Sequence, residues 1–184
     1  MNVFISGGCK NGKSSFAERI AKRISTGGLY YVATMIPYDK EDDKRIANHI
    51  ASRAGMGFTT LEIPRRIEKC LEHGGKNASF LIDSVTALLV NELYPDIHSG
   101  SADPLAAKRC REGLIAVARG AENAVFVSDY IFSDCERYDG FTEEYRVGLA
   151  SIDRALAREC DCVIELCAGN AIIHKGGGLI EKIL

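Results

Sequence analysis

Residues 7–14 combine glycines, a lysine and a serine at a spacing that suits phosphate chemistry. They read Gly7-Gly8-Cys9-Lys10-Asn11-Gly12-Lys13-Ser14. This segment fits G-x-x-x-x-G-K-[ST], the P-loop pattern, in which backbone N–H groups and a helix N-terminus bind phosphate oxygens. Lys13 would stabilise the β- and γ-phosphates, and the Ser14 hydroxyl would bind Mg²⁺. The pattern predicts binding of a nucleoside triphosphate; the alternative is a glycine-rich turn that only begins a helix.

A second group of residues with chemical potential lies between positions 42 and 53. Arg45, His49 and Arg53 are four residues apart, so on a helix they would form one stripe. Because arginine neutralises phosphate oxygens and neutral imidazole is a nucleophile near pH 7, this stripe suits attack on a phosphorus atom. The alternative is a solvated basic helix face that carries a histidine without a chemical role.

Acidic residues follow two of the apolar runs that we expect to be strands. Asp83 comes directly after the run at 80–82. In P-loop proteins, the acid that holds Mg²⁺ occupies this position at the end of a strand. Its alternative role is to cap a helix that begins near Ser84. Asp129 closely follows the run at 124–127 and is a second candidate acid, or else it caps a turn. Ligands of parallel sheets bind beyond the carboxyl ends of the strands, so a shared site is predicted there.

The elements that must position these residues alternate along the chain. Short apolar runs are separated by segments with helical spacing, which predicts an α/β domain with a mainly parallel sheet and helices on both faces. The expected strands are 3–5, 29–33, 80–82, 124–127 and 163–166. The expected helices lie near 13–25, 42–53, 64–73, 84–94, 103–121 and 141–159.

Three further segments complete this organisation. Residues 171–174 could add a last edge strand, which we expect to be antiparallel. Residues 95–103 have the composition of a surface loop. We therefore expect a single domain over 1–175, followed by a tail over 176–184 that is mobile or packs on a neighbouring molecule.

Composition narrows the class of protein. The chain of 184 residues is 46% hydrophobic and 26% charged, as is usual for one globular domain. A net charge of −2 gives no broad positive surface, so no nucleic-acid partner is expected. The apolar runs are too short to cross a membrane or form a signal peptide, which favours a cytoplasmic location. Seven cysteines without a C-x-x-C pair favour reduced thiols.

The order of the motifs resembles that of one known family. A GGxxxGKS loop at 7–14 is followed by YVAT at 31–34, RIxxHxxxR at 45–53, TxE at 60–62 and LID at 81–83. Together these motifs resemble the bifunctional adenosylcobinamide kinase/adenosylcobinamide-phosphate guanylyltransferase family of cobalamin biosynthesis. The resemblance spans nearly the whole chain and is densest from residue 3 to residue 94.

The resemblance implies two reactions on a corrinoid substrate, with ATP and GTP as nucleotide substrates and Mg²⁺ as cofactor. First, the terminal hydroxyl of the aminopropanol arm of adenosylcobinamide takes the γ-phosphoryl group of a nucleoside triphosphate. Second, GMP passes from GTP to a histidine with release of pyrophosphate, and then to the corrinoid phosphate; this histidine corresponds to His49. The resemblance also implies a P-loop NTPase-like (RecA-like) fold and a homotrimer.

The site residues follow from the motifs and from the resemblance together. We expect His49 and Lys13 to be catalytic, and Ser14 and Asp83 to bind the metal. Glu62 could accept hydrogen bonds from guanine, although a contact with the sugar or the metal is equally open. The expected nucleotide-binding residues are Gly7, Gly8, Cys9, Lys10, Asn11, Gly12, Lys13, Ser14, Ala33, Thr34, Met35, Ile50, Ala51, Ser52, Arg53, Glu62 and Asp83.

One region departs from the family pattern, and two other functions compete with the one implied. Residues 128–130 read Ser-Asp-Tyr where the family has Ser/Thr-Asn-Glu, and we expect corrinoid or catalytic-loop contacts within 128–140. The first competitor is a P-loop small-molecule kinase in which His49 is only structural; it would phosphorylate cobinamide without forming a GMP adduct. The second is a GTP-binding switch module, which would bind nucleotide without transferring any group.

Overall fold

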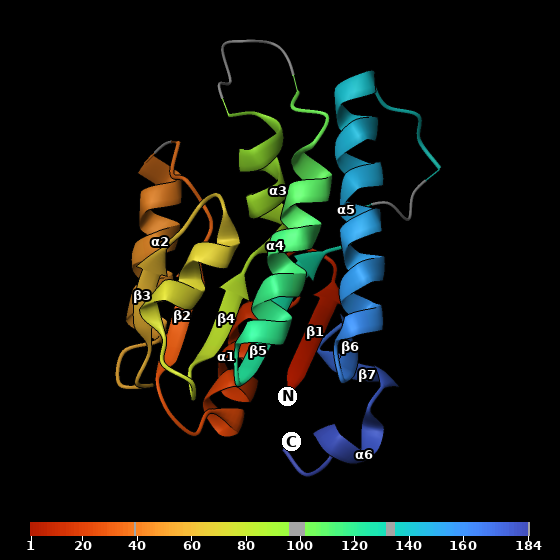
Figure 1. Ribbon diagram of the computed structural model, residues 1–184. Coiled ribbons are helices and arrows are strands. Elements are labelled where there is room, and N and C mark those ends of the chain that lie inside the picture. The colour runs from red at the N-terminus through yellow and green to blue at the C-terminus, as the bar shows by residue number, and fades with distance from the viewer. Residues whose placement is uncertain (39, 96–101, 132–134, 184) are drawn as a thin grey trace.

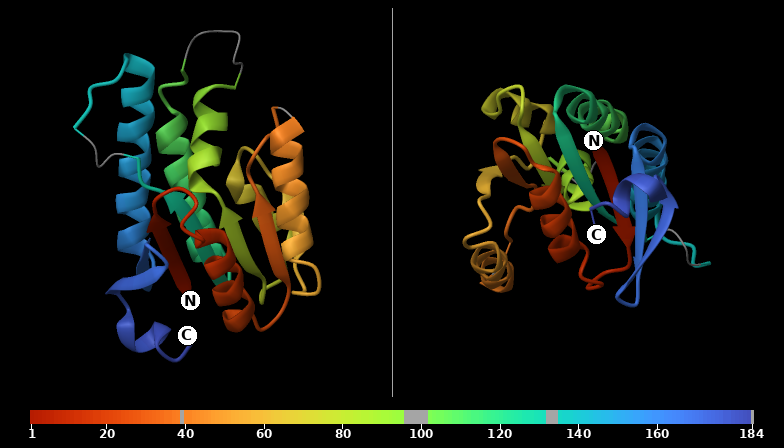
Figure 2. Two further views of the ribbon diagram at one scale, coloured as in Figure 1. Left: turned by 180° about the vertical axis from the view of Figure 1, so that it is seen from behind. Right: turned by 90° about the horizontal axis from the view of Figure 1, so that it is seen from below.

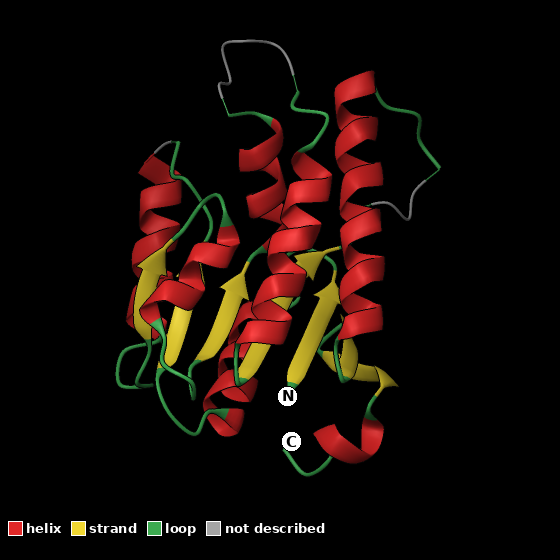
Figure 3. Ribbon diagram, in the orientation of Figure 1, coloured by secondary structure: helices red, strands yellow, loops and turns green. Residues whose placement is uncertain are grey.

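The fold is a seven-stranded sheet with helices on both faces (Figures 1 and 3). The computed structural model describes residues 1–38, 40–95, 102–131 and 135–183, with the side chains of all of these except 43–45, 48, 49 and 52. The strands are β1 Asn2–Gly7, β2 Leu29–Ala33, β3 Thr59–Glu62, β4 Ser79–Asp83, β5 Asn123–Asp129, β6 Cys162–Cys167 and β7 Asn170–Lys175. The helices are α1 Lys13–Ile24, α2 Lys40–Ser52, the 3₁₀ helix η1 Ile67–His73, α3 Val85–Leu93, α4 Ala106–Gly120, α5 Gly140–Glu159 and α6 Gly177–Ile180.

The sheet is parallel except at one edge, and this confirms the predicted α/β class. Its strand order is β3-β2-β4-β5-β1-β6-β7. Only β7 runs antiparallel, beside β6, as expected for the last strand. Strand β5 lies between β1 and β4 and pairs in parallel with both. The carboxyl ends of β1, β5 and β4 therefore lie side by side at the same edge of the sheet. The segments that follow these three strands can share one site.

Helices cover the two faces unequally (Figure 2). The larger core lies under η1, α3, α4 and α5 and includes Phe4, Phe80 and Phe126. The second core lies under α1 on the opposite face and includes Val3 and Ile5. Successive residues of β1 thus point into different cores. This explains why the central strands read as continuous apolar runs instead of alternating ones.

Two predictions about elements were wrong. Strand β3 was not expected, because only Leu61 among its four residues is apolar and the strand lies at the edge of the sheet. The helix expected over 64–73 is the shorter 3₁₀ helix η1, which begins at Ile67. Arg66, directly before it, has φ 54°, a left-handed conformation that cannot continue a helix. The loop expected at 95–103 lies mostly outside the described residues.

The carboxyl-terminal segment packs on its own chain. Ile180 of α6 is fully buried in the core that faces α1, and the side chain of Ile183 packs against the same core. The expectation that this tail is mobile or packs on a neighbouring molecule is therefore wrong for 177–183. In the part of the chain that the structure describes, there is no helix that is both long and apolar enough to cross a bilayer.

Candidate active site

The loop after β1 is held tightly against the end of β6. A Cβ atom at Gly7 would lie 2.5 Å from the carbonyl oxygen of Leu166, so only glycine fits at this position. The amide nitrogen of the Asn11 side chain donates a hydrogen bond to the same carbonyl at 3.1 Å. Gly12 has φ 80° and leads directly into α1, which begins at Lys13. The predicted strand–loop–helix arrangement is therefore present, with the loop at the amino-terminal end of a twelve-residue helix.

Lys13 pairs with an acid from the neighbouring strand. Its side chain is 6% exposed, and its Nζ atom donates hydrogen bonds of 2.6 Å to Asp129 Oδ1 and to the carbonyl of Gly8. The parallel register of β1 and β5 sets Gly7 opposite Asp129, which brings the acid to the loop. The Asp129 backbone N–H donates to the Thr86 hydroxyl at 2.9 Å. The sequence leaves two roles open for Asp129, a second acid of the site or the cap of a turn. Its contact with Lys13 places it next to the phosphate loop.

Asp83 lies at the end of β4 with its carboxylate directed to the same edge of the sheet. The Tyr31 hydroxyl donates a hydrogen bond of 2.8 Å to Asp83 Oδ2. Helix α3 is capped by Ser84, whose Oγ accepts a hydrogen bond of 3.2 Å from the N–H of Ala87. The alternative in which Asp83 caps this helix is therefore wrong, and its carboxylate is left to face the cavity.

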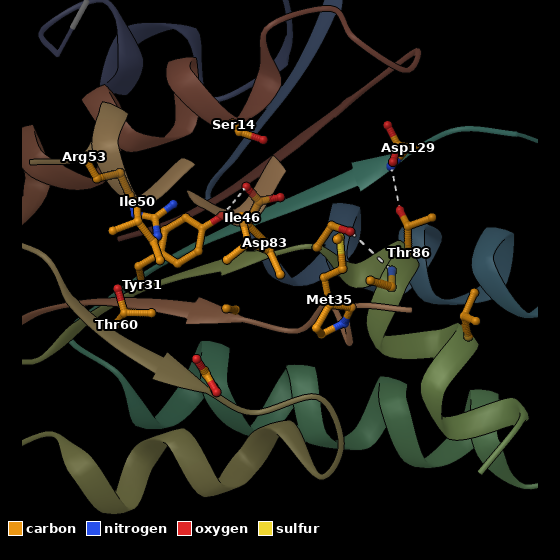
Figure 4. A pocket seen from close by; sticks show the side chains of 16 residues that line it. Ser14, Tyr31, Met35, Ile46, Ile50, Arg53, Thr60, Asp83, Thr86 and Asp129 are labelled. Atoms are coloured by element: carbon orange, nitrogen blue, oxygen red, sulfur yellow. Dashed lines mark hydrogen bonds between the residues drawn. The ribbon is translucent and has the colours of Figure 1, made fainter. Parts of the chain in front are cut away.

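Two adjoining cavities open at the carboxyl ends of the strands, and Figure 4 shows the one that Tyr31 and Arg53 line. Ser14, Asp83, Ser84 and Asp129 line both cavities, which places the phosphate loop and the acids around one continuous opening. The smaller cavity, of 330 Å³, is lined mainly by residues 9–15, which form the phosphate loop and the start of α1. The larger has a volume of 510 Å³ and is lined by Ser14, Tyr31, Ala33, Met35, Pro37, Ile46, Ile50, Arg53, Thr60, Glu62, Asp83, Ser84, Thr86, Ala87, Val90 and Asp129.

Arg53 is buried beside the site, and not exposed on a solvated face. Its side chain is 6% exposed, and its guanidinium carbon lies 3.4 Å from the centre of the Tyr31 ring (Figure 4). The Nη1 atom is 3.7 Å from Oε1 of Glu18 on α1. Burial raises the pKa of the Glu18 carboxyl, while the positive charge of Arg53 opposes that shift. The contacts of Arg53 with Tyr31 and Glu18 hold the end of α2 next to α1, the helix that follows the phosphate loop.

Some of the expected site residues line the two cavities and others do not. Gly7, Gly8, Thr34 and Ala51 line neither cavity. Thr34 is fully buried, and its hydroxyl oxygen accepts a hydrogen bond of 2.8 Å from the Ser84 N–H. The side chains of Arg45, His49 and Ser52 lie outside the described part of the structure. The other expected residues line one cavity or both, namely Cys9, Lys10, Asn11, Gly12, Lys13, Ser14, Ala33, Met35, Ile50, Arg53, Glu62 and Asp83.

Sequence reasoning missed several residues that line the larger cavity. Tyr31 precedes Ala33 by two positions on β2, so strand alternation could have placed both on the same face. Thr86 lies on α3 three residues after Asp83, within the first turn of the helix that the site contacts. Ile46 lies on α2 four residues before Ile50 and also lines the larger cavity, so helical spacing could have placed the two on one face.

The donor set fits a magnesium ion bound together with nucleotide phosphates. Ser14 and Asp83 supply hard oxygen ligands, and both line both cavities. Among the described residues there is no group of three or more His, Cys, Asp or Glu side chains that could hold a metal ion alone. Mg²⁺ is usually held by one or two protein oxygens with phosphates and water completing its shell, and this arrangement suits such a site.

Comparison with known proteins covers both the fold and the family. The solved structures that match include the type III secretion ATPase EscN from enteropathogenic E. coli, with a TM-score of 0.56 and 15% identity over 91% of this chain and 43% of that chain. They also include the ATP synthase subunit NeqB from Nanoarcheaum equitans, with a TM-score of 0.55 and 9% identity over 90% of this chain and 45% of that chain. This chain therefore spans less than half the length of either protein. The similarities show that the fold is the P-loop (RecA-like) ATPase fold.

Sequence comparison identifies the family. A bifunctional adenosylcobalamin biosynthesis protein, CobP of Pseudomonas aeruginosa, is 29% identical over 178 residues, which cover 96% of this chain and 98% of that protein. The family model for cobinamide kinase / cobinamide phosphate guanyltransferase matches residues 3–173. This match includes the phosphate loop, Asp83, Asp129 and the whole of α2. The chain therefore belongs to the cobinamide kinase / cobinamide phosphate guanyltransferase family.

Proposed function

We propose that this protein carries out both reactions of its family, phosphorylating adenosylcobinamide and then transferring GMP from GTP to the product. One observation carries the proposal beyond family membership. The phosphate loop, the strand-end acids and two side chains of α2, Ile46 and Ile50, line one continuous opening, so a single nucleotide site can serve both reactions. Adenosylcobinamide is the proposed acceptor because the resemblance and the matched family both point to a cobinamide.

For the kinase reaction, we assign the phosphate loop and Lys13 to the triphosphate. The hydroxyl oxygen of the aminopropanol arm attacks the γ-phosphorus and releases its proton to water, the bond from that phosphorus to the β,γ-bridging oxygen breaks, and a nucleoside diphosphate leaves. Lys13 stabilises the charge on the phosphates and exchanges its contact with Asp129 for them. Ser14 and Asp83 would hold Mg²⁺, which when bound neutralises phosphate charge.

For the nucleotidyl reaction, we assign His49 as the nucleophile. An imidazole nitrogen attacks the α-phosphorus of GTP, the bond to the α,β-bridging oxygen breaks, and pyrophosphate leaves. An oxygen of the corrinoid phosphate then displaces the histidine and forms the final phosphoanhydride. Support comes from the helix itself, because Ile46 and Ile50, which flank position 49 on α2, both line the larger cavity. Arg45 or Arg53 would neutralise the α-phosphate.

A labelling experiment tests the nucleotidyl assignment. With GTP labelled in its α-phosphate, wild-type protein is expected to carry an acid-labile, base-stable label, whereas His49→Ala is expected to carry none. The His49→Ala protein should still phosphorylate cobinamide, because the phosphate loop is unchanged. Equal labelling of the two proteins would refute the role of His49. Phosphorylated cobinamide without a label on wild type would instead identify a plain P-loop kinase.

We also propose that the protein acts as a cytoplasmic homotrimer, on the strength of the family resemblance.

The region that departs from the family pattern supports retention of both reactions, since Asp129 keeps a carboxylate at the phosphate loop through its contact with Lys13. Mass analysis of the products from cobinamide, GTP and Mg²⁺ tests both reactions together. A product larger than cobinamide phosphate by one GMP is the expected result.

A further inference from the structure

The hydroxyl of Tyr31 fixes one oxygen of Asp83. It donates a hydrogen bond of 2.8 Å to Oδ2 of that carboxylate. A phenol is protonated at neutral pH, so the Tyr31 hydroxyl acts as the donor in this bond. A carboxylate held through one oxygen has a restricted orientation. Its other oxygen is then presented to the cavity that Ser14 also lines.

The ring of Tyr31 also holds the segment that contains α2. The guanidinium carbon of Arg53 lies 3.4 Å from the ring centre, and Phe58 packs edge-on against the ring with centroids 6.1 Å apart. Among the described residues from 35 to 62, Arg53 is the only one that is buried. Ile50 of α2, by contrast, is 53% exposed. Besides the pairing of β3 with β2 and the contact of Arg53 with Glu18, the stack on Tyr31 is therefore a buried attachment of this segment, and a cation on an aromatic face is most stable where both are desolvated.

We infer that Tyr31 is a positioning residue with two partners: its hydroxyl orients the metal-binding carboxylate of Asp83, and its ring seats Arg53 and thereby places α2. The inference rests on the proposed function, because it takes Asp83 as a metal ligand and α2 as the carrier of the nucleophile. Tyr31 itself touches neither reacting phosphorus in this scheme. Its effect passes through Asp83 and through Arg53, and each partner can be tested separately.

The first test measures how much Mg²⁺ strengthens GTP binding, by calorimetric titration with Mg²⁺ and with EDTA. Tyr31→Phe keeps the ring and removes only the hydroxyl. We expect it to lower the Mg²⁺-dependent gain in GTP affinity about tenfold, as is typical when a residue that orients a metal ligand is lost. Affinity in EDTA should be unchanged. An unchanged gain, or an equal loss with and without Mg²⁺, would overturn the inference.

Two further variants make this test specific. Tyr30→Phe makes the same chemical change on the preceding residue of β2, whose ring stacks on Phe80 with centroids 5.3 Å apart; it should keep the full Mg²⁺-dependent gain. In an Asp83→Asn background, Tyr31→Phe should change the gain by less than about twofold, because the partner that it orients is already altered. Additive losses in the double variant would contradict the proposed contact.

The second test separates the ring from the hydroxyl. At saturating Mg²⁺ and GTP, Tyr31→Phe should label with α-phosphate-labelled GTP at nearly the wild-type rate, because Arg53 keeps its aromatic seat. Tyr31→Leu fills the space without an aromatic face and should label about tenfold more slowly. Circular dichroism of both variants checks that the fold is intact. Equal labelling rates in the two variants would refute the link to α2.

Failure of this inference is distinguishable from failure of the proposed function. The GTP titrations contain no corrinoid, so their outcome does not depend on which acceptor the protein uses. If wild type binds GTP more tightly with Mg²⁺ but fails to phosphorylate cobinamide, the proposed function is wrong and the role of the Tyr31 hydroxyl stands. If cobinamide is converted normally by Tyr31→Phe at limiting Mg²⁺, the inference is wrong and the proposed function stands.

Discussion

Replacement of Asp153 by asparagine is predicted to stabilise the protein at neutral and alkaline pH. Asp153 lies on α5, is 6% exposed, and lines a mainly apolar cavity of 600 Å³ between that helix and strands β1 and β6. Among the described residues, neither of its carboxylate oxygens makes a hydrogen bond of normal geometry, although the Ser128 hydroxyl lies nearby. Burial raises the pKa of this carboxyl to about 7; the Ser128 hydroxyl opposes the shift and the charge of Asp129 adds to it.

The size and sign of the effect follow from the two pKa values of Asp153. In the unfolded chain the carboxyl titrates near 3.8 and in the folded chain at about 7, so between these values the folded state binds more protons. The free energy of unfolding therefore falls as pH rises through this window and is constant above it. Each pKa unit is worth about 1.4 kcal/mol, which gives an upper bound of about 4 kcal/mol overall and about 3 kcal/mol between pH 5 and pH 8.

Urea unfolding of both proteins at pH 5 and pH 8 tests this reasoning. Circular dichroism is the suitable signal because the chain contains no tryptophan. Asparagine has the same shape and no charge, so Asp153→Asn should gain up to about 3 kcal/mol more over wild type at pH 8 than at pH 5. Using this difference removes the contribution of Glu18, whose pKa is also raised. A stability difference that is the same at both pH values would refute the assignment of a buried, unpaired carboxyl.

Two further predictions concern residues that shape the site. Gly7→Ala would place a Cβ atom 2.5 Å from the Leu166 carbonyl oxygen, so we expect the free energy of unfolding to fall by about 1–3 kcal/mol and GTP binding to weaken. Gly140→Ala is the control for stability, because its Cβ atom would meet nothing within 4 Å. A Gly7→Ala protein with unchanged stability would disprove the tight contact. Thr34→Val removes a buried hydroxyl that forms hydrogen bonds with both the N–H and the carbonyl of Ser84, and it should lower the free energy of unfolding by about 2–4 kcal/mol. Thr34→Ser keeps the hydroxyl and should retain most of the stability. Equal losses of stability in the two variants, measured by thermal denaturation, would argue against this pair of hydrogen bonds.

The sheet and the phosphate loop could be predicted from sequence because their signals are local. The run at 3–5 is apolar throughout since β1 is buried on both faces, and the glycines around Lys13 are required by backbone geometry. The family resemblance added the order of motifs and thereby the function. Strand β3 carries no such signal, because it lies at the sheet edge with one apolar residue and gains its structure from pairing with β2.

The parts that sequence reasoning missed depend on contacts between distant residues. The spacing of Arg45, His49 and Arg53 predicts one helical stripe, but Arg53 lies just beyond α2 and is buried against Tyr31, twenty-two positions earlier in the chain. Nothing local to either residue indicates that stack. Asp129 is a similar case, since its pairing with Lys13 across 116 positions follows from the β1–β5 register.

The insertion of β5 between β1 and β4 has a consequence for how such proteins can diversify. Neighbouring strands lie about 4.8 Å apart, so the strands that carry the phosphate loop and Asp83 are separated by about 10 Å, with the tip of β5 midway. Exchanges at 129 and 130 therefore alter the middle of the opening while both flanking strands keep their places. The middle of the opening can therefore be reshaped at this single strand tip while the phosphate loop and Asp83 stay on their own strands.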